Sequence, residues 1–172
     1  IIWLLVLLFV VGFAAWQIFV PSAREKVGVD YKNAAYLVEG VEVVLRDGVS
    51  EVSIVEDSAA SVVTRYFGNE AQGDLNADGV KDTAFLITQE AGGSATFFYL
   101  VAALSVPGKP DRVTGTNAIF LGDRIAPQTT EIHGTEIIVN YAIRTADAAF
   151  TDSASIGMSK KVRIVNNKLI EE

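Results

Sequence analysis

The first residues of the chain form one long apolar run. Residues 1–20 read IIWLLVLLFVVGFAAWQIFV, and Gln17 is the one strongly polar side chain among them. At about 1.5 Å per residue, a helix of this length spans about 30 Å, which matches the hydrocarbon core of a bilayer. Trp3 and Trp16 lie toward the two ends, where interfacial tryptophans are favoured, and Pro21 ends the helix. The pattern predicts a transmembrane anchor over residues 1–21, followed by a linker over residues 22–34.

Two other interpretations of this apolar run were weighed. A cleaved signal peptide is disfavoured, because the run is long and no small-x-small cleavage motif follows it. An apolar helix that ends near a proline also resembles the helix of type IV pilin-like subunits. Those helices generally carry an early glutamate and continue past the proline, whereas this chain has Leu5 and soon turns to strand-like sequence.

After the linker, short apolar runs alternate with Gly, Asn and Asp, which is typical of strands separated by turns. Glu39-Gly40 and Asp47-Gly48 are hairpin-turn signals. The runs predict strands over residues 35–38, 41–45, 61–67, 83–89, 96–104, 117–121, 136–141 and 161–165. Short helices over residues 58–63 or 145–150 are an open alternative. We therefore predict a mainly β domain over residues 35–172, an antiparallel sandwich or open barrel.

Two details of this pattern concern single segments. Residues 107–112 (PGKPDR) are predicted to form a surface loop, since their two prolines exclude a central strand. Alternation along the run TFFYLVAAL places Phe97 and Tyr99 on one face and Phe98 and Leu100 on the other. These rings could face a ligand, but burial in a two-layer core explains them without one.

Composition and charge narrow the range of functions that the chain could have. The net charge is −7 and residues 1–23 carry no charged side chain, so the acidity belongs to the rest of the chain. An acidic surface repels phosphate backbones, which disfavours nucleic acid as a partner. The chain has no cysteine and one histidine, His133, so thiol chemistry, zinc–thiolate sites and histidine-based triads lack their parts. His133 is predicted to be a turn or surface residue.

Residues 73–82, GDLNADGVKD, form the one sequence motif that indicates a binding site, and the ligand it indicates is a metal ion. Oxygen-bearing side chains recur at spacings 1, 3, 5 and 9, with glycine at 6, as in the first part of an EF-hand loop. Alternate side chains of a tightly wound loop converge on one point, and the carbonyl at position 7 joins them. Oxygen ligands alone suit calcium. The predicted metal ligands are Asp74, Asn76, Asp78, Val80 and Asp82.

The motif departs from the EF-hand at position 12, which is Phe85 rather than a bidentate glutamate. The loop leads into an apolar strand, so it resembles the loop of FG-GAP repeats, present here in one copy. Without the glutamate we expect a structural calcium with a dissociation constant on the order of 10⁻⁴ to 10⁻³ M, as in extracellular modules. The alternative is an Asx-rich turn whose side chains cap their own backbone.

Longer stretches resemble a family of uncharacterised, membrane-anchored bacterial proteins. They are TRYFGNEAQGDLNADGVKD, TFFYLVAAL, TNAIFLGDRIAPQTTEI and IIVNYAIR, and the resemblance extends from Tyr36 to the end. It implies an exported, anchored β-rich domain and adds no activity.

The sequence thus favours a non-catalytic, membrane-anchored binding or structural module with a calcium-stabilised loop. The alternative is a pilin-like filament subunit, or an accessory subunit of a membrane complex, packed through its apolar helix. Expected partners are membrane lipid at residues 1–20 and a protein or a second copy of the chain. Arg24 and Lys26 weakly favour a cytoplasmic domain. The calcium motif favours a periplasmic or cell-surface location, and we give it more weight.

Overall fold

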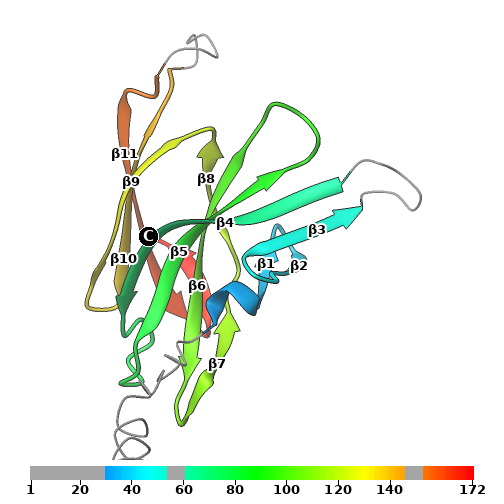
Figure 1. Cartoon of the computed structure of the whole chain (residues 1–172). Helices are drawn as coiled ribbons and strands as arrows, with labels where there is room; N and C mark the ends of the chain where they lie inside the picture. The colour runs from blue at the N-terminus through cyan, green and yellow to red at the C-terminus, as the bar shows by residue number, and fades with distance from the viewer. Residues whose placement is uncertain (1–29, 54–60, 146–152) are drawn as a thin grey trace, which may run out of the picture.

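The computed structural model describes residues 30–53, 61–145 and 153–172. In this part the chain forms one 3-10 helix and twelve strands (Figure 1). In order they are η1 (Tyr31–Asn33), β1 (Ala35–Val38), β2 (Val41–Val44), β3 (Val49–Ser53), β4 (Ser61–Gly73), β5 (Asp82–Glu90), β6 (Phe97–Val106), β7 (Lys109–Gly115), β8 (Ile119–Asp123), β9 (Ala126–His133), β10 (Glu136–Ile143), β11 (Ile156–Val165) and β12 (Lys168–Glu171).

The strands form three sheets, and every strand pair is antiparallel. A six-stranded sheet has the order β3-β4-β5-β6-β7, with β8 also pairing β6; a four-stranded sheet has the order β12-β11-β10-β9; β1 and β2 form a separate hairpin. The prediction of a mainly β, antiparallel domain is confirmed. The predicted anchor, 1–21, lies outside the described residues. Within them, no helix combines the length and apolar character that crossing a bilayer requires.

The sheets are stacked in three layers, because the two faces of β5 and β6 are both apolar. Leu86, Leu100 and Ala102 face the four-stranded sheet and pack against residues such as Val139. Phe85, Ile87, Tyr99 and Val101 face the other way and are covered by the β1–β2 hairpin. In Figure 1 the four-stranded sheet and this hairpin lie on opposite sides of the central sheet. The predicted alternation of Phe97/Tyr99 and Phe98/Leu100 is confirmed, and both faces are core.

Two tight turns set the position of the hairpin layer. Glu39 and Gly40 have φ of 50° and 85°, and Asp47 and Gly48 have φ of 49° and 80°. Consecutive left-handed residues define the turn type whose twist matches antiparallel strands, so both sequence signals are confirmed. The first turn closes β1 against β2. The second turn takes the chain from β2 in the hairpin layer to β3 in the central sheet.

Several predicted segments differ from the structure. Residues 109–112 belong to strand β7 rather than a loop, because a terminal strand tolerates Pro110. Residues 61–63 are strand and not helix; residues 146–150 of the other suggested helix lie outside the described part. The strand predicted at 61–67 runs on to Gly73 across two irregularities in its pairing. Strands β3, β9 and β12 were not predicted.

Candidate functional site

The loop between β4 and β5 is held by bonds from its own acidic and amide side chains. Asp74 accepts the backbone N–H of Asp78 at 3.1 Å through Oδ1 and that of Gly79 at 2.9 Å through Oδ2. Asn76 Oδ1 accepts the Asp78 N–H at 3.1 Å, and Asp78 Oδ1 accepts the Val80 N–H at 2.8 Å. The side chains at positions 1 and 3 therefore meet at one backbone amide, with the side chain of position 5 bonded to Asn76 Nδ2 at 3.0 Å.

Asp82 lies at the other end of the loop and is fully buried. Its Oδ2 accepts the N–H of Leu75 at 3.0 Å, and its Oδ1 accepts the N–H of Ser105 on β6 at 2.8 Å. Burial raises the pKa of this carboxyl; the two amide bonds act against that rise, while the charges of Asp78 and Asp74 add to it. The side chain thus fixes both ends of the loop to the central sheet. Its buried carboxylate lies near other negative charges, which favours its neutralisation by a proton or a cation.

The structure brings the predicted ligands together in part. The side chains of Asp74, Asn76 and Asp78 gather around shared amides, whereas Asp82 is turned toward Leu75 and Ser105. Across the described residues, no group of three or more Asp, Glu, His or Cys side chains is placed to hold a metal ion. Asn76 is an amide and supplies a further oxygen to the set. The calcium site stays a prediction, and the loop as described is a network of Asx turns.

A groove opens beside the central sheet, where the β1–β2 hairpin stops covering it. Its volume is about 440 Å³. Val62, Thr64 and Gln89 of β4 and β5 form the floor, and the side chain of Gln89 donates to Thr64 Oγ1 at 3.3 Å. The hairpin contributes one wall and β3 the other; the remaining lining residues are Val38, Glu39, Val41, Glu42, Val43, Val52 and Ser53.

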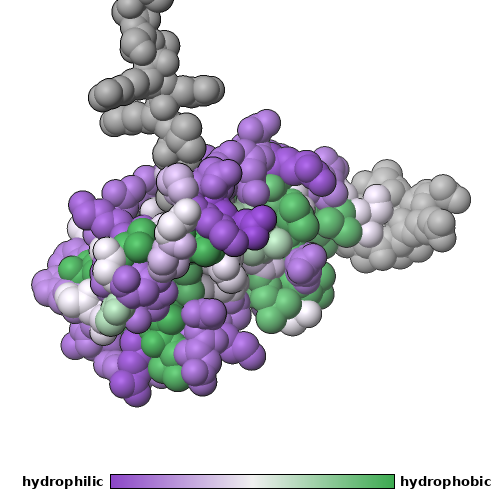
Figure 2. Space-filling model, turned by 90° about the horizontal axis from the view of Figure 1, so that it is seen from below, coloured by the Kyte–Doolittle hydropathy of each residue, from purple (hydrophilic) through white to green (hydrophobic). Residues whose placement is uncertain are grey.

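The walls of this groove expose apolar side chains to water. Val41 of the hairpin is 64% exposed and Val52 of β3 is 54% exposed. Viewed from below, apolar surface gathers on the side of the molecule where β3 lies (Figure 2). Two lining residues, Glu39 and Glu42, are acidic, and none of the residues that line the groove is Lys or Arg. The groove therefore combines aliphatic surface with negative charge.

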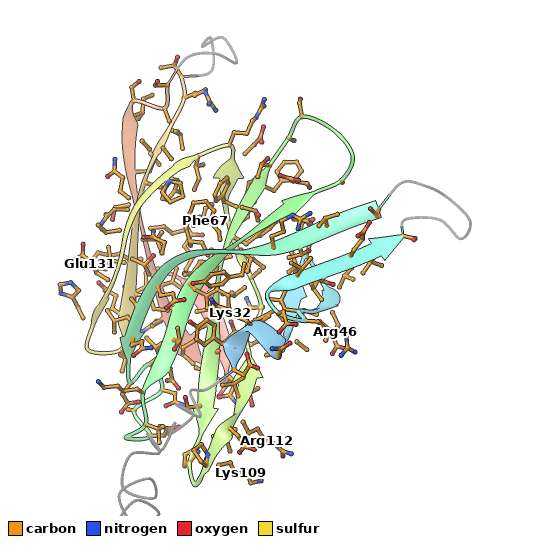
Figure 3. The ribbon with its side chains drawn as sticks, in the orientation of Figure 1. Lys32, Arg46, Phe67, Lys109, Arg112 and Glu131 are labelled. Carbon is orange, nitrogen blue, oxygen red and sulfur yellow. The ribbon has the colours of Figure 1, made fainter. Side chains whose placement is uncertain are left out.

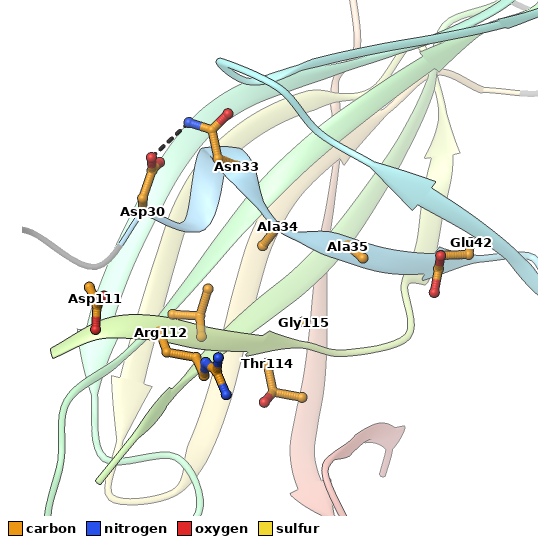
Figure 4. A pocket seen from close by; sticks show the side chains of 10 residues that line it. Asp30, Asn33, Ala34, Ala35, Glu42, Asp111, Arg112, Thr114 and Gly115 are labelled. Carbon is orange, nitrogen blue, oxygen red and sulfur yellow. Dashed lines mark hydrogen bonds between the residues drawn. The ribbon is translucent and has the colours of Figure 1, made fainter. Parts of the chain in front are cut away.

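A second concave region lies between β1 and β7 (Figure 4). It has a volume of about 700 Å³ and is lined mostly by polar and charged groups, among them Asp30, Asp111 and Arg112. Asp30 accepts the side-chain N–H of Asn33 at 2.7 Å. The region has little apolar surface, so it is a wide polar depression rather than an apolar pocket of the kind that buries a small molecule.

Two tyrosines share one carboxylate beneath the η1 helix. Tyr31 donates to Glu70 Oε1 at 2.6 Å, and Tyr66 donates to the same oxygen. Lys32 Nζ lies 3.9 Å from the centre of the Tyr66 ring. Burial opposes ionisation of Glu70, but the two hydroxyl bonds and the Lys32 charge outweigh it and lower its pKa. Both rings pack against Phe85, so this cluster fastens the start of the described chain to β4 and β5.

His133 is at the end of β9, exposed, with Nε2 3.2 Å from Glu131 Oε2. It is a surface residue, as the sequence predicts. Sequence reasoning missed the groove altogether. The exposed valines of β2 and β3 were available as a signal, but their position depends on how the hairpin layer is offset from the sheet.

Comparison of the chain with models of known protein families, with curated proteins and with solved structures found no match.

Proposed function

We propose that this protein is a non-catalytic, membrane-anchored binding module, with its β domain outside the cytoplasm and its 74–82 loop stabilised by calcium. Residues 1–20 supply the anchor in this proposal. The stacked sheets favour a sandwich over an open barrel. The groove between the hairpin and β3 is the binding surface, and its partner is a protein.

The observation that carries this proposal is the groove with its exposed valines. Contiguous apolar surface is costly to leave in water, and on soluble domains it marks sites of association. Val41 and Val52 come from two different layers and both line the groove, so a ligand there would contact the hairpin and the central sheet together. A surface of this form is suited to binding rather than to acid–base chemistry, because its lining has two carboxylates and no histidine or lysine.

Calcium is supported by the chemistry of the loop. Asp74, Asn76 and Asp78 place hard oxygen atoms around a short segment of backbone, which suits calcium. These residues and the carbonyl of Val80 would hold the ion, and Asp82 would reach it through a water, since its own oxygens already accept amides. A bound cation would stiffen the loop and offset the charge of Asp82. It would supply no reactive centre.

Site-specific photo-crosslinking in the native host tests the binding surface. A photoreactive amino acid is placed at Val41 or Val52, and in a control at Val165, an equally apolar and 42% exposed residue of β11. We expect one discrete crosslinked product from positions 41 and 52 and none from position 165. Loss of that difference would remove the proposed binding surface. A product of twice the chain's mass would instead favour the filament or self-associating alternative.

The location is tested in the same cells. If the β domain lies outside the cytoplasm, a protease that cannot cross the inner membrane will degrade it after the outer layers are opened. A cytoplasmic marker protein should survive in the same sample. Protection of the domain under conditions that degrade a known periplasmic protein would place it in the cytoplasm and contradict this part of the proposal.

A further inference from the structure

Strand β3 has one edge in the sheet and one edge that faces the groove side. Gly48 O accepts the N–H of Tyr66 at 2.7 Å, so even-numbered residues of this strand direct their backbone bonds toward β4. Val49 exchanges bonds of 2.8 Å and 3.0 Å with Arg46 on the opposite side. Because backbone groups alternate along a strand, Glu51 and Ser53 point their N–H and C=O groups the same way as Val49. Among the described strands, none pairs with that edge.

Strand β3 differs from the other terminal strands of the two larger sheets in having none of the residues that most discourage the addition of another strand. β7 carries Lys109, Pro110 and Arg112, β9 carries Pro127, and β12 is short and begins with Lys168. Lysine and proline on a terminal strand discourage the addition of another strand. Lys109 and Arg112 project from β7 in Figure 3. β3 reads VSEVS and has neither lysine nor proline. Its edge is thus the least protected of the four.

The side chains of β3 define what could be added. Val52 lines the groove, and Glu51 points to the opposite face of the sheet, since neighbouring residues of a strand alternate. A residue paired with Val52 would lie within about 5.5 Å of it, over the groove, and its neighbours would lie beside Glu51. An aliphatic residue suits the first position and a basic residue suits the second. Glu39 and Glu42 in the lining add to the negative charge of this part of the surface.

Resting on the proposed function, we propose that the partner supplies an extended segment of alternating aliphatic and basic residues, which adds as a strand to the open edge of β3. Backbone bonds to Glu51 and Ser53 hold the segment, and its aliphatic side chains fill the groove. A second copy of this chain is a poorer occupant, because each copy brings a net charge of −7 and two more carboxylates to the contact.

Synthetic peptides test this inference directly. The probe is a fluorescein-labelled octapeptide of alternating Lys and Val, with binding followed by fluorescence anisotropy against the full chain in detergent. One control peptide alternates Glu and Val. The other has the same Lys and Val composition as the probe, but its lysines and its valines are grouped in two separate blocks. We expect the alternating Lys/Val peptide to bind at least about tenfold more tightly than either control, and to weaken as salt is added.

Four variants separate edge addition from general electrostatic attraction. Ser53→Pro removes the outward N–H without touching the bonds to β4, so the domain should stay folded while the peptide loses at least about tenfold in affinity. Ser53→Ala keeps the N–H and should bind like the native chain. Glu51→Lys should weaken binding, whereas Glu131→Lys, on the far strand β9 (Figure 3), should not. A melting curve checks that each variant is folded.

Three outcomes would overturn the inference. The peptide fails to bind, or Ser53→Pro binds it as well as Ser53→Ala does, or the chain forms dimers that Ser53→Pro abolishes. Each is separate from the crosslinking result at positions 41 and 52. A discrete crosslinked partner without affinity for the Lys/Val peptide would leave the groove as the binding surface and would reject this class of partner.

Discussion

Asp82 accepts the backbone N–H of Ser105 at 2.8 Å while being fully buried itself. Its other oxygen accepts the N–H of Leu75, so one side chain joins the end of the 74–82 loop to β6. In Asp82→Asn, the amide group would face one of these two donors and leave it without an acceptor. We expect the free energy of unfolding to fall by about 1–3 kcal/mol. Urea denaturation in the presence of a calcium chelator measures it.

The matched control for that change is Asp111→Asn, because Asp111 is an exposed aspartate of β7. Its effect should stay within about 0.5 kcal/mol, as for ordinary surface substitutions. Equal stability of the two variants would mean that the buried bonds of Asp82 contribute nothing specific to the fold.

Calcium should stabilise the domain through the same loop. With a dissociation constant of 10⁻⁴ to 10⁻³ M, about 10 mM calcium would add roughly 1.4–2.7 kcal/mol to the free energy of unfolding. We expect the melting temperature of the native chain to rise accordingly, and that of Asp78→Ala to stay unchanged. Magnesium at the same concentration is the control for ionic strength, and it should have a smaller effect because it demands stricter octahedral geometry.

If calcium leaves the native chain unchanged, the Asx-turn network of Asp74, Asn76 and Asp78 is the whole structure of the loop. The main argument for placing the domain outside the cytoplasm then fails as well. If Asp78→Ala responds as the native chain does, the ion binds elsewhere.

Gly115 of β7 is in contact with the backbone of β1. A Cβ atom at this position would overlap the carbonyl oxygen of Ala35 and would lie 2.8 Å from the ring of Tyr36. Neither atom can move without displacing the hairpin layer, so Gly115→Ala should cost about 3 kcal/mol or more. Gly157→Ala is the control, since a Cβ there has nothing within 4 Å. Comparable urea midpoints for the two variants would contradict the close contact.

The sequence predicted the parts of the fold that have a local cause. Glu39-Gly40 and Asp47-Gly48 form the turns that their residue types favour, and the apolar runs of β5 and β6 form the central strands. β9 was missed because its sequence, APQTTEIH, has few apolar residues and buries only alternate positions in part. The two prolines of PGKPDR predict a loop, but the terminal position of β7 in its sheet lets Pro110 stay in a strand.

The candidate sites likewise divide into features that have a local cause and features that depend on tertiary structure. The spacing of Asp74, Asn76 and Asp78 is a local property of a loop, and in the structure the side chains of Asp74 and Asn76 both accept the backbone N–H of Asp78. The inward turn of Asp82 depends on Ser105, more than twenty residues away, so spacing could not show it. The groove depends on the offset between two layers, and hydrophobic periodicity carries no information about that offset.

Stability at alkaline pH should depend on Tyr66. Its burial, together with the hydrogen bond to Glu70 and the charge of that carboxylate, raises its pKa from 10.0 to about 12. The unfolded chain therefore loses this proton at lower pH than the folded chain does. The stabilisation from neutral Tyr66 is fully present below about pH 10 and is lost as the pH rises through about 12.

We expect Tyr66→Phe to flatten the fall in urea midpoint over this window. Because Tyr31 bonds to the same oxygen of Glu70, the slope should diminish and not vanish. A slope in Tyr66→Phe equal to that of the native chain would show that the shared carboxylate does not couple this hydroxyl to folding.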